Sequence, residues 1–208
     1  MGHNLWYRVM GSENRRASSI NRSTKETDIE VRLALDGNGK TKIKTDVPFL
    51  DHMLTLFSVH GFFEFQVTAR GDVEVDGHHT VEDIGICLGS AFAEALGDKS
   101  GINRYGSSYL PMDETLVRVV VDISNRPFLV YNVSIPDQKV GTFDTALVME
   151  FMRAFSQYCG VTLHIDLIHG ENSHHIIEAI FKALGRAMNQ AVTKNLSLGG
   201  ALSSKGWL

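Results

Sequence analysis

A five-residue pattern, H-H-x-x-E, occurs twice in this chain of 208 residues and constrains its fold more than any other feature. The copies lie in "DGHHTVEDIGICLGSAFAEAL" and "GENSHHIIEAIFKALGRAM", and their first histidines are His78 and His174. Each copy opens a segment with apolar residues at helical spacing, and each follows a strand-like segment and an earlier helical segment that ends in glycine. We therefore predict an internal duplication, with repeats at about 22–100 and 101–195.

The residues around each motif predict a similar order of elements in both halves. Alternating or continuous apolar residues predict strands at 28–35, 40–45, 62–75, 105–112, 115–123, 128–135 and 161–170. Apolar residues three and four positions apart predict helices at 48–61, 79–96, 143–160 and 174–194. The glycine-rich stretch at 36–39 is expected to be the turn of a hairpin. Two sheets around a shared helical layer would form one α+β domain over 21–208, after a flexible arm at 1–20.

Composition excludes several classes of protein. The formal net charge of −4 gives no general electrostatic basis for binding nucleic acid or a membrane surface. No run of apolar residues approaches the roughly 20 needed to span a bilayer, and the N-terminal segment lacks the apolar core of a signal peptide. Cys87 and Cys159 lie within apolar helical patterns and are expected to be reduced. We therefore expect a cytoplasmic protein with no nucleic-acid or membrane partner.

The spacing of the motif suits metal binding by a helix. Residues four positions apart lie on one helical face, whereas adjacent residues diverge by about 100°. The first histidine and the glutamate of each copy can therefore share one ion, and the second histidine must face a different ion. Imidazole and carboxylate groups are common ligands of manganese, zinc and iron. The candidate ligands are His78, His79, Glu82, His174, His175 and Glu178.

Two further candidate ligands lie one helix upstream of the motifs. His52 and Glu150 occupy nearly equivalent places in the two repeats. They bring the number of candidates to eight, which is enough for two four-ligand sites with positions left open for a substrate. A single histidine at a helix start more often caps the helix or makes an ordinary polar contact. Two copies in register would each need a separate structural role, so we favour metal binding.

Several basic residues outside the motif suit a phosphate group. Arg104 in "NRYG", Arg126 in "SNRP" and the pair Ser204 and Lys205 in "LSSKGWL" lie in loops or near strand ends. Arginine forks and hydroxyl groups bind phosphate well, although each of these residues alone is more often a surface charge. The sequence contains no P-loop, dinucleotide fingerprint or nucleophile elbow.

Longer stretches are specific enough to indicate a family. They are "FLDHML", "GHHTVEDIGICLG", "YGSSYLPMDETLVRVVVDISNRP" and "TLHIDLIHGENSHHIIEAIFKALGRAM". These stretches closely resemble the imidazoleglycerol-phosphate dehydratase family, the manganese enzymes of histidine biosynthesis. The resemblance runs from about Arg22 to the "SSKG" tail. It implies a fold of the ribosomal protein S5 domain 2-like type and a phosphate-binding tail at 196–208.

The resemblance implies two Mn²⁺ ions in each active site. One ion would take His52, His79, His174 and Glu178. The other would take His78, Glu82, Glu150 and His175. Each ion then draws on both halves of the chain, in agreement with the helical geometry. This chain differs from many relatives at Glu150, where they carry a histidine, but a carboxylate can also ligate manganese.

The resemblance also implies contacts to a substrate. His52, His78 and His174 would lie against its imidazole ring. The phosphate pocket would be formed by Arg104, Arg126, Ser204 and Lys205. Glu26 matches a substrate-contacting glutamate, and Asp113 would lie near the site. The general base would be Glu26 or Glu178, with Glu171 as a third candidate.

The implied reaction removes water from D-erythro-imidazole-glycerol phosphate and gives imidazole-acetol phosphate. Two manganese ions on the ring would act as Lewis acids and favour its imidazolate, whose electrons expel the adjacent hydroxyl group. A carboxylate would then remove the proton of the next carbon. Similar proteins assemble as 24-mers built from trimers, with active sites at subunit interfaces, so we expect a homo-oligomer.

The duplicated motif by itself leaves two other functions open. A two-metal phosphomonoester hydrolase would also combine paired ions with arginines, although such enzymes usually use more aspartates. A structural cage held together by metal ions would need the ligands but no reaction. The matched arginines and the C-terminal tail favour the dehydratase.

Overall fold

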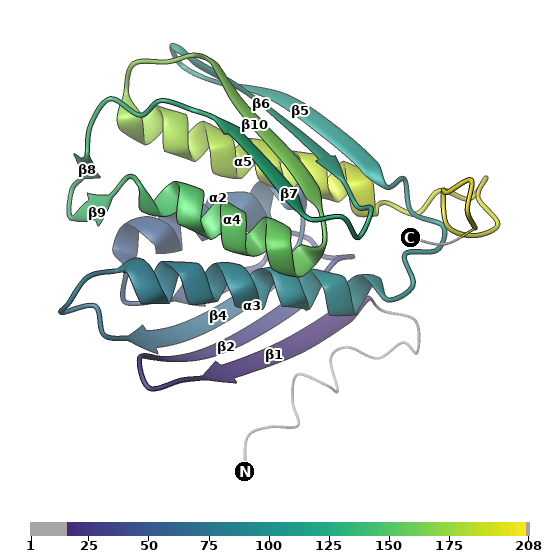
Figure 1. Ribbon diagram of the computed structural model, residues 1–208, viewed down its shortest axis with the longest axis horizontal. Coiled ribbons are helices and arrows are strands. Elements are labelled where there is room, and N and C mark those ends of the chain that lie inside the picture. The colour runs from purple at the N-terminus through teal and green to yellow at the C-terminus, as the bar shows by residue number, and fades with distance from the viewer. Residues whose placement is uncertain (1–15, 207–208) are drawn as a thin grey trace.

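The fold contains two four-stranded sheets. Burial alternates along their strands, and Figure 1 shows that each sheet turns one face to the helices. The computed structural model describes residues 16–206. The first sheet contains β1 (Ala17–Ser23), β2 (Thr27–Ala34), β3 (Thr41–Lys44) and β4 (Glu64–Gly71). The second sheet contains β5 (Tyr105–Met112), β6 (Thr115–Asp122), β7 (Phe128–Asn132) and β10 (Thr162–His169). A small ribbon is formed by β8 (Lys139–Val140) and β9 (Phe143–Asp144).

The helices of the described residues lie between the two sheets (Figure 1). They are α2 (Pro48–Gly61), α3 (His78–Leu96), α4 (Leu147–Cys159) and α5 (Ser173–Val192). Helix α3 packs on β1 and β2, and α5 packs on β5 and β6. Across the middle of the molecule, α2 packs against α5 and α4 packs against α3. Each of these two helix pairs therefore joins one half of the chain to the other.

The strand orders demonstrate the duplication. The first sheet has the order β1-β2-β4-β3 and the second β5-β6-β10-β7, so each strand takes the place of its counterpart. In both sheets the last pair is parallel and the other pairs are antiparallel. The predicted fold class, an α+β duplication with two sheets around a shared helical layer, is confirmed.

Aromatic residues from both halves meet in one core. The ring centroids of Phe57 on α2 and Phe92 on α3 are 5.9 Å apart, and Phe155 on α4 lies 5.7 Å from Phe92. All three side chains are almost completely buried. Because buried aromatic pairs stabilise a fold beyond the area they bury, this cluster fixes α2, α3 and α4 relative to one another.

Two equivalent glycines allow the helices to cross closely. A Cβ atom on Gly185 of α5 would lie 2.3 Å from the carbonyl oxygen of Phe57 on α2. A Cβ atom on Gly89 of α3 would lie 2.7 Å from the carbonyl oxygen of Phe155 on α4. No side chain fits at either distance, so glycine sets how near each upstream helix approaches the helix that carries the motif.

The expected hairpin at 36–39 is wrong. Strand β3 does not pair with β2, because β4 lies between them and pairs antiparallel with β2 over eight positions, from Thr27 with Gly71 to Ala34 with Glu64. The loop packs closely on the start of β4, where a Cβ atom on Gly37 would lie 2.3 Å from the nitrogen of Glu64. The longer β2–β4 ladder replaces the local pairing, and β3 takes the outer edge of β4.

Several element boundaries differ from the sequence-based expectations. The expected arm at 1–20 overlaps β1, which begins at Ala17 and pairs with β2; residues 1–15 lie outside the described residues. Strand β4 ends at Gly71 rather than at 75. Helix α4 begins at Leu147 rather than at 143, because Thr145 Oγ1 donates to the carbonyl of Asp137 and holds the preceding segment outside the helix.

The end of α2 agrees with the prediction. Gly61 is its last residue, and Phe62 takes the left-handed conformation with φ of 56°. Glycine is needed at 61 for packing, since a Cβ atom there would lie 2.3 Å from the ring of Phe63.

Both cysteines are buried free thiols. Among the described residues, no helix has the length and apolar character needed to cross a membrane.

Candidate metal centre

The histidine pair of each motif lies in the first turn of a long helix, and Figure 1 shows these turns at the same end of the molecule as the β8–β9 ribbon. A polar residue fixes each turn. The side chain of Asn172 accepts hydrogen bonds from the N–H groups of His174 and His175 at 2.9 and 3.2 Å. Asp76 accepts from the N–H group of His78 at 2.8 Å. The Asn172 cap of α5 and the Asp76 hydrogen bond before α3 hold the two imidazole pairs at the exposed start of their helices.

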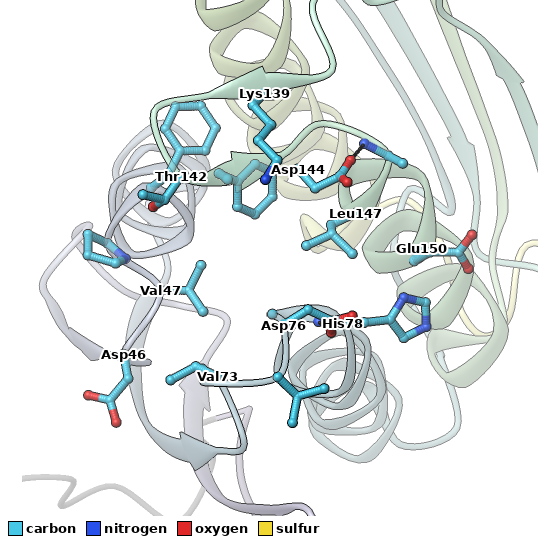
Figure 2. Close-up of a pocket in the computed structure, with 16 residues that line it drawn as sticks. Asp46, Val47, Val73, Asp76, His78, Lys139, Thr142, Asp144, Leu147 and Glu150 are labelled. Atoms are coloured by element: carbon cyan, nitrogen blue, oxygen red, sulfur yellow. Dashed lines mark hydrogen bonds between the residues drawn. The ribbon is translucent and has the colours of Figure 1, made fainter.

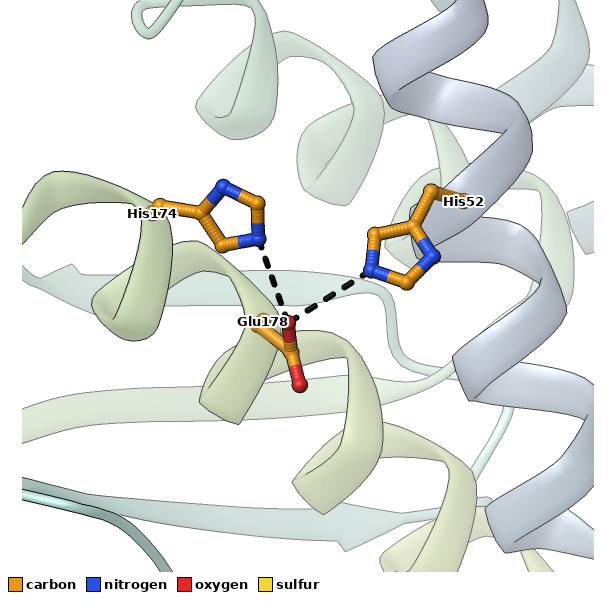
Figure 3. Close-up of side chains that lie close together, drawn as sticks. All are labelled: His52, His174 and Glu178. Carbon is orange, nitrogen blue, oxygen red and sulfur yellow. Dashed lines mark hydrogen bonds and ion pairs between the residues drawn. The ribbon is translucent and has the colours of Figure 1, made fainter.

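Three predicted ligands meet between α2 and α5, and we name His52, His174 and Glu178 the first ligand group (Figure 3). Glu178 Oε2 lies 3.2 Å from Nε2 of His174 and 3.5 Å from Nε2 of His52. All their ligand atoms lie within 4.8 Å of one another. Ligands about 2.1 Å from one ion lie about 3.0–3.4 Å apart, so the group fits a divalent ion.

Glu178 is held in its ionised form by its surroundings. Its side chain is only 10% exposed, and its other oxygen, Oε1, forms an ion pair with Lys182 one turn further along α5. Burial tends to raise the pKa of Glu178, but Lys182, His174 and His52 together lower it below its ordinary value. The lone pairs of Oε2 therefore face the two imidazoles as an anionic ligand.

A second set of predicted ligands lies where α4 crosses α3, and we name His78, Glu82 and Glu150 the second ligand group. Nε2 of His78 lies 3.7 Å from Oε2 of Glu82. His78 and Glu150 line one pocket of about 540 Å³, shown in Figure 2. The carboxylate of Glu150 forms an ion pair with Arg153 on its own helix. This group is less closely assembled than the first.

The second histidine of each motif lies apart from both groups. Nδ1 of His79 is 3.0 Å from Oδ2 of Asp72, and Nδ1 of His175 is 2.8 Å from Oε2 of Glu114. Hydrogen bonding to Asp72 raises the pKa of His79, and hydrogen bonding to Glu114 raises that of His175. The same bond contributes most to holding the pKa of Glu114 well below its usual range.

One chain therefore brings together three members of the first predicted four-ligand set, whereas in the second set His78 lies near Glu82 and shares a pocket with Glu150. His79 is not in the cluster of His52, His174 and Glu178, and His175 faces Glu114 and Asp113 instead of the second ligand group. The two missing positions are equivalent in the repeat.

The three candidate bases have different surroundings. Glu178 has both oxygens engaged, as described above. Glu26, in the loop between β1 and β2, is 56% exposed and its Oε2 lies 3.8 Å from Nδ1 of His79. Glu171 precedes α5 and lines a depression of about 470 Å³ together with His174. Asp113, in the turn between β5 and β6, lies 3.8 Å from Nε2 of His175.

The predicted phosphate-binding residues lie at the other end of α5. Arg104 donates to Asp122 through Nε and Nη2, at 2.7 and 3.2 Å, and through Nη1 to the carbonyl of Leu202 in the tail. Arg126 shares Asp122 at 3.3 Å and is 67% exposed. Arg104 and Ser204 line a depression of about 570 Å³. The backbone N–H of exposed Lys205 donates to Ser203.

The metal ligands and the basic residues are far apart within one chain. The N–H of Arg104 donates to the carbonyl of Ala191 near the end of α5, while His174 lies in its first turn. At 1.5 Å per residue the helix separates these positions by about 25 Å. Figure 1 shows the C-terminal tail at the end opposite the β8–β9 ribbon.

Sequence reasoning overlooked three residues of this region. The ion pair of Lys182 with Glu178 could have been predicted, because residues four positions apart on a helix face each other. Asp72 and Glu114 lie 7 and 61 residues before the histidines they contact. No local pattern places either carboxylate beside an imidazole, so these contacts depend on the tertiary fold.

The chain is similar to known proteins of one family over most of its length. The profile of a family described as imidazoleglycerol-phosphate dehydratase matches residues 45–188. A protein of that name from Desulfotalea psychrophila is 62% identical over 196 residues, which cover 94% of this chain and 98% of the relative. Another, from Trichlorobacter lovleyi, is 56% identical over 93% of this chain and 100% of its own length.

Solved structures are similar over most of the chain. The crystal structure of imidazoleglycerol-phosphate dehydratase from Staphylococcus aureus is 47% identical, with a TM-score of 0.79, and the match covers 86% of this chain and 99% of that one. The corresponding structure from Pyrococcus furiosus is 41% identical, also with a TM-score of 0.79, over 91% and 100% of the two chains.

Proposed function

The chain belongs to the imidazoleglycerol-phosphate dehydratase family, and from this premise we propose that it converts D-erythro-imidazole-glycerol phosphate to imidazole-acetol phosphate with two bound Mn²⁺ ions. Membership makes the chain a hydro-lyase of histidine biosynthesis. Family membership therefore argues against the two alternatives, a two-metal phosphomonoester hydrolase and a structural cage. A cytoplasmic location is part of the proposal and rests on the biosynthetic role of the family.

The convergence of the first ligand group is the observation that carries the proposal. Two imidazole nitrogens and one carboxylate oxygen from α2 and α5 meet at 3.2 and 3.5 Å, although His52 and His174 are 122 residues apart. A cap or an ordinary polar contact requires no third partner. A divalent ion at the centre of the group explains why all three side chains point to one position.

The second ligand group supports a second ion. His78 and Glu82 occupy on α3 the positions that His174 and Glu178 occupy on α5, and Glu150 corresponds to His52. Each group lacks one member of its four-ligand set. His79 and His175 supply these members from neighbouring copies of the chain, which is consistent with a homo-oligomer such as a 24-mer built from trimers.

Substrate length also favours active sites shared between copies. Only three carbon atoms and one oxygen separate the imidazole ring from the phosphorus atom of the substrate. The distance of about 25 Å along α5 between His174 and the Arg104 region is far too long for such a molecule to bridge. The ring therefore binds at the ligand groups of one copy, while Arg126, Ser204 and Lys205 of another copy bind the phosphate.

The carboxylates of the chain have two separate roles, as a metal ligand and as the general base. When bound, the two ions supply positive charge that favours loss of a ring proton and so assists departure of the hydroxyl group. Glu178 is occupied as a ligand, with Lys182 on its other oxygen, and cannot also accept a proton. Glu26 is the favoured base because its exposed carboxylate lies beside His79, and Glu171 is the alternative. Arg104 anchors the C-terminal tail through Leu202.

An assay of product formation tests the proposal. Manganese-loaded protein is expected to form imidazole-acetol phosphate without releasing inorganic phosphate, and protein treated with a chelator is expected to be inactive until manganese is restored. Release of free phosphate, or full turnover after complete removal of metal, would contradict it.

A further inference from the structure

We propose that Asp72 and Glu114 are positioning residues that hold the Nδ1 proton of His79 and His175, so that Nε2 of each ring is free to bind metal. The inference rests on the proposed function, because it takes both histidines as metal ligands. Neither carboxylate belongs to the predicted ligand sets, and neither was distinguishable in the sequence.

The contact between Glu114 and His175 is fixed on both sides of the carboxylate. Oε2 of Glu114 faces Nδ1 of His175 at 2.8 Å. Oε1 accepts hydrogen bonds from the N–H groups of Glu171 and Asn172 at 3.3 and 3.0 Å, and from the hydroxyl of Thr115 at 3.0 Å. The backbone before α5 therefore holds this carboxylate in one orientation, and the carboxylate in turn orients the ring.

The contact between Asp72 and His79 has the same chemistry but a looser frame. Both oxygens of Asp72 face Nδ1 of His79, Oδ2 at 3.0 Å and Oδ1 at 3.3 Å. The backbone N–H of Asp72 donates to the carbonyl of Glu26 and fixes the start of the loop. Among the described residues, neither oxygen of the Asp72 side chain accepts a hydrogen bond from a backbone N–H group. The carboxylate is therefore less firmly oriented than that of Glu114.

An ionised carboxylate beside Nδ1 determines which nitrogen can bind a metal. A carboxylate only accepts hydrogen bonds, so the neutral ring must carry its proton on Nδ1. The lone pair is then on Nε2. Histidine ligands generally donate their second N–H group to such a partner, which fixes the ring and makes the ligand more basic. The His79 and His175 side chains are 40% and 26% exposed, which leaves them accessible to a neighbouring copy.

The two contacts are equivalent in space but not in sequence. Asp72 follows β4, whereas Glu114 lies in the turn between β5 and β6. In the strand registers Glu114 corresponds to Glu26, which lies 3.8 Å from Nδ1 of His79, and the residue after β10 that corresponds to Asp72 is Gly170. The carboxylate nearest to each Nδ1 atom therefore comes from a different position of the repeat. Carboxylates from different elements at the same nitrogen of equivalent histidines indicate a requirement of the site itself.

The Glu114→Gln variant gives the sharpest test, because the structure dictates how its amide must point. The amide oxygen has to accept from the N–H groups of Glu171 and Asn172, so the NH₂ group faces Nδ1 of His175. The ring must then accept at Nδ1 and carry its proton on Nε2, where the metal should bind. We expect the affinity for one of two Mn²⁺ ions to fall by about 10–100-fold.

The Asp72→Asn variant is expected to have a smaller effect. Its amide can rotate and present oxygen to Nδ1, since both oxygens of Asp72 now face the ring. The Asp72→Ala variant cannot compensate in this way and should lose about 10-fold in affinity. The matched control is Glu74→Gln, which alters an exposed carboxylate two residues further along the same loop.

Two readouts distinguish positioning from a purely structural role. Manganese titration followed by electron paramagnetic resonance gives the number and affinity of bound ions. Solid-state ¹⁵N NMR of histidine-labelled, metal-free protein shows which ring nitrogen carries the proton, and the difference between wild type and Glu114→Gln isolates His175. We expect a shift of that proton from Nδ1 to Nε2 in the variant and no change in Glu74→Gln. If Glu114→Gln fails to fold, Asp72→Ala carries the test.

Separate outcomes would overturn the inference and the proposed function. Wild-type protein that binds two ions and turns over, while Glu114→Gln and Asp72→Ala keep full affinity and the Nδ1 proton, would overturn the inference alone. Wild-type protein that binds no manganese through His79 or His175 would overturn the proposed function as well.

Discussion

In the first ligand group Glu178 is 10% exposed and its Oε2 reaches two histidines, whereas in the second ligand group Glu82 is 46% exposed and reaches one histidine of residues 16–206, His78. The two groups occupy equivalent places on a duplicated scaffold. They differ in what surrounds the glutamate. Lys182 follows Glu178 by one turn and forms an ion pair with it, but the equivalent residue after Glu82 is Ile86, which carries no charge.

The members contributed by the upstream helices differ as well. His52 turns towards Glu178, while Glu150 turns towards Arg153 on its own helix. The side chains of the first ligand group therefore converge on one position, whereas in the second group Glu150 is paired with Arg153. The comparison shows that duplicated backbone geometry does not guarantee duplicated electrostatics, and it predicts that the first site binds manganese more tightly than the second.

Replacing the glutamate of each motif should have the largest effect on turnover, and it should distinguish the two ligand groups by their stability. Glu178→Gln and Glu82→Gln should each lose one of two bound ions and more than ~100-fold of turnover, because each removes a charged ligand. Only Glu178→Gln should also lower the free energy of unfolding, by about 1–3 kcal/mol, because Lys182 loses its partner in a 15% exposed position. Metal analysis and urea denaturation check both. Equal stability of the two variants would contradict the difference proposed here.

The candidate bases allow a second comparison between the halves. Glu26→Gln should reduce kcat by ~10²–10⁴-fold while both ions remain bound, because a positioned base contributes about that much. Glu171→Gln should change kcat far less. Steady-state kinetics with a parallel manganese count measures this. A Glu26→Gln enzyme with full turnover and full metal content would exclude Glu26 as the base.

The helix crossings give a third, intermediate effect. Gly185→Ala and Gly89→Ala should each cost about 1–3 kcal/mol of stability through overpacking. The cost should be larger for Gly185, where the added Cβ atom would lie 2.3 Å from a carbonyl oxygen instead of 2.7 Å. Gly185→Ala should weaken the first site and Gly89→Ala the second. Gly199→Ala, which has open space around its Cβ position, is the control and should leave both unchanged.

The pH dependence of the metal-free protein is the smallest effect expected. The folded-state pKa values of His79 and His175 are raised above 6.5 by Asp72 and Glu114. A raised pKa contributes stability that is fully present below the unfolded value of 6.5 and is lost as pH rises through the folded value. Urea midpoints should therefore fall slightly from pH 6 towards alkaline pH.

A matched variant sharpens the pH prediction. Protein carrying both Asp72→Asn and Glu114→Gln lacks the two carboxylates and should show a flatter profile over the same range. An identical slope in the variant and the wild type would show that other groups cause the dependence.

Much of the fold could be predicted because its signals are local. The apolar periodicity of α3 and α5 and the repeated motif follow from residues a few positions apart. The pairing of β3 could not be predicted, because a four-residue strand carries little register information and the choice depends on the longer β2–β4 ladder. Helix α4 begins four residues later than predicted because Thr145 donates a hydrogen bond to the carbonyl of Asp137, and apolar periodicity does not reveal such a contact.

The site divides in the same way. Helical spacing was sufficient to pair His174 with Glu178 and to separate His175 from them. The contact of His52 with Glu178 depends on the close crossing of α2 and α5 at Gly185, and the contacts of Asp72 and Glu114 depend on where loops end in space. Spacing predicts which ligands share a helix face, whereas partners from other elements need the fold.

Anomalous diffraction at the manganese edge, from crystals of the assembled protein grown with Mn²⁺, tests the central claim most directly. We expect two peaks per chain, one among His52, His174 and Glu178 with His79 of a neighbouring copy, and one among His78, Glu82 and Glu150 with His175 of a neighbouring copy. Ligand groups that hold only water at saturating manganese, or an ion bound by one chain without a neighbour, would contradict it.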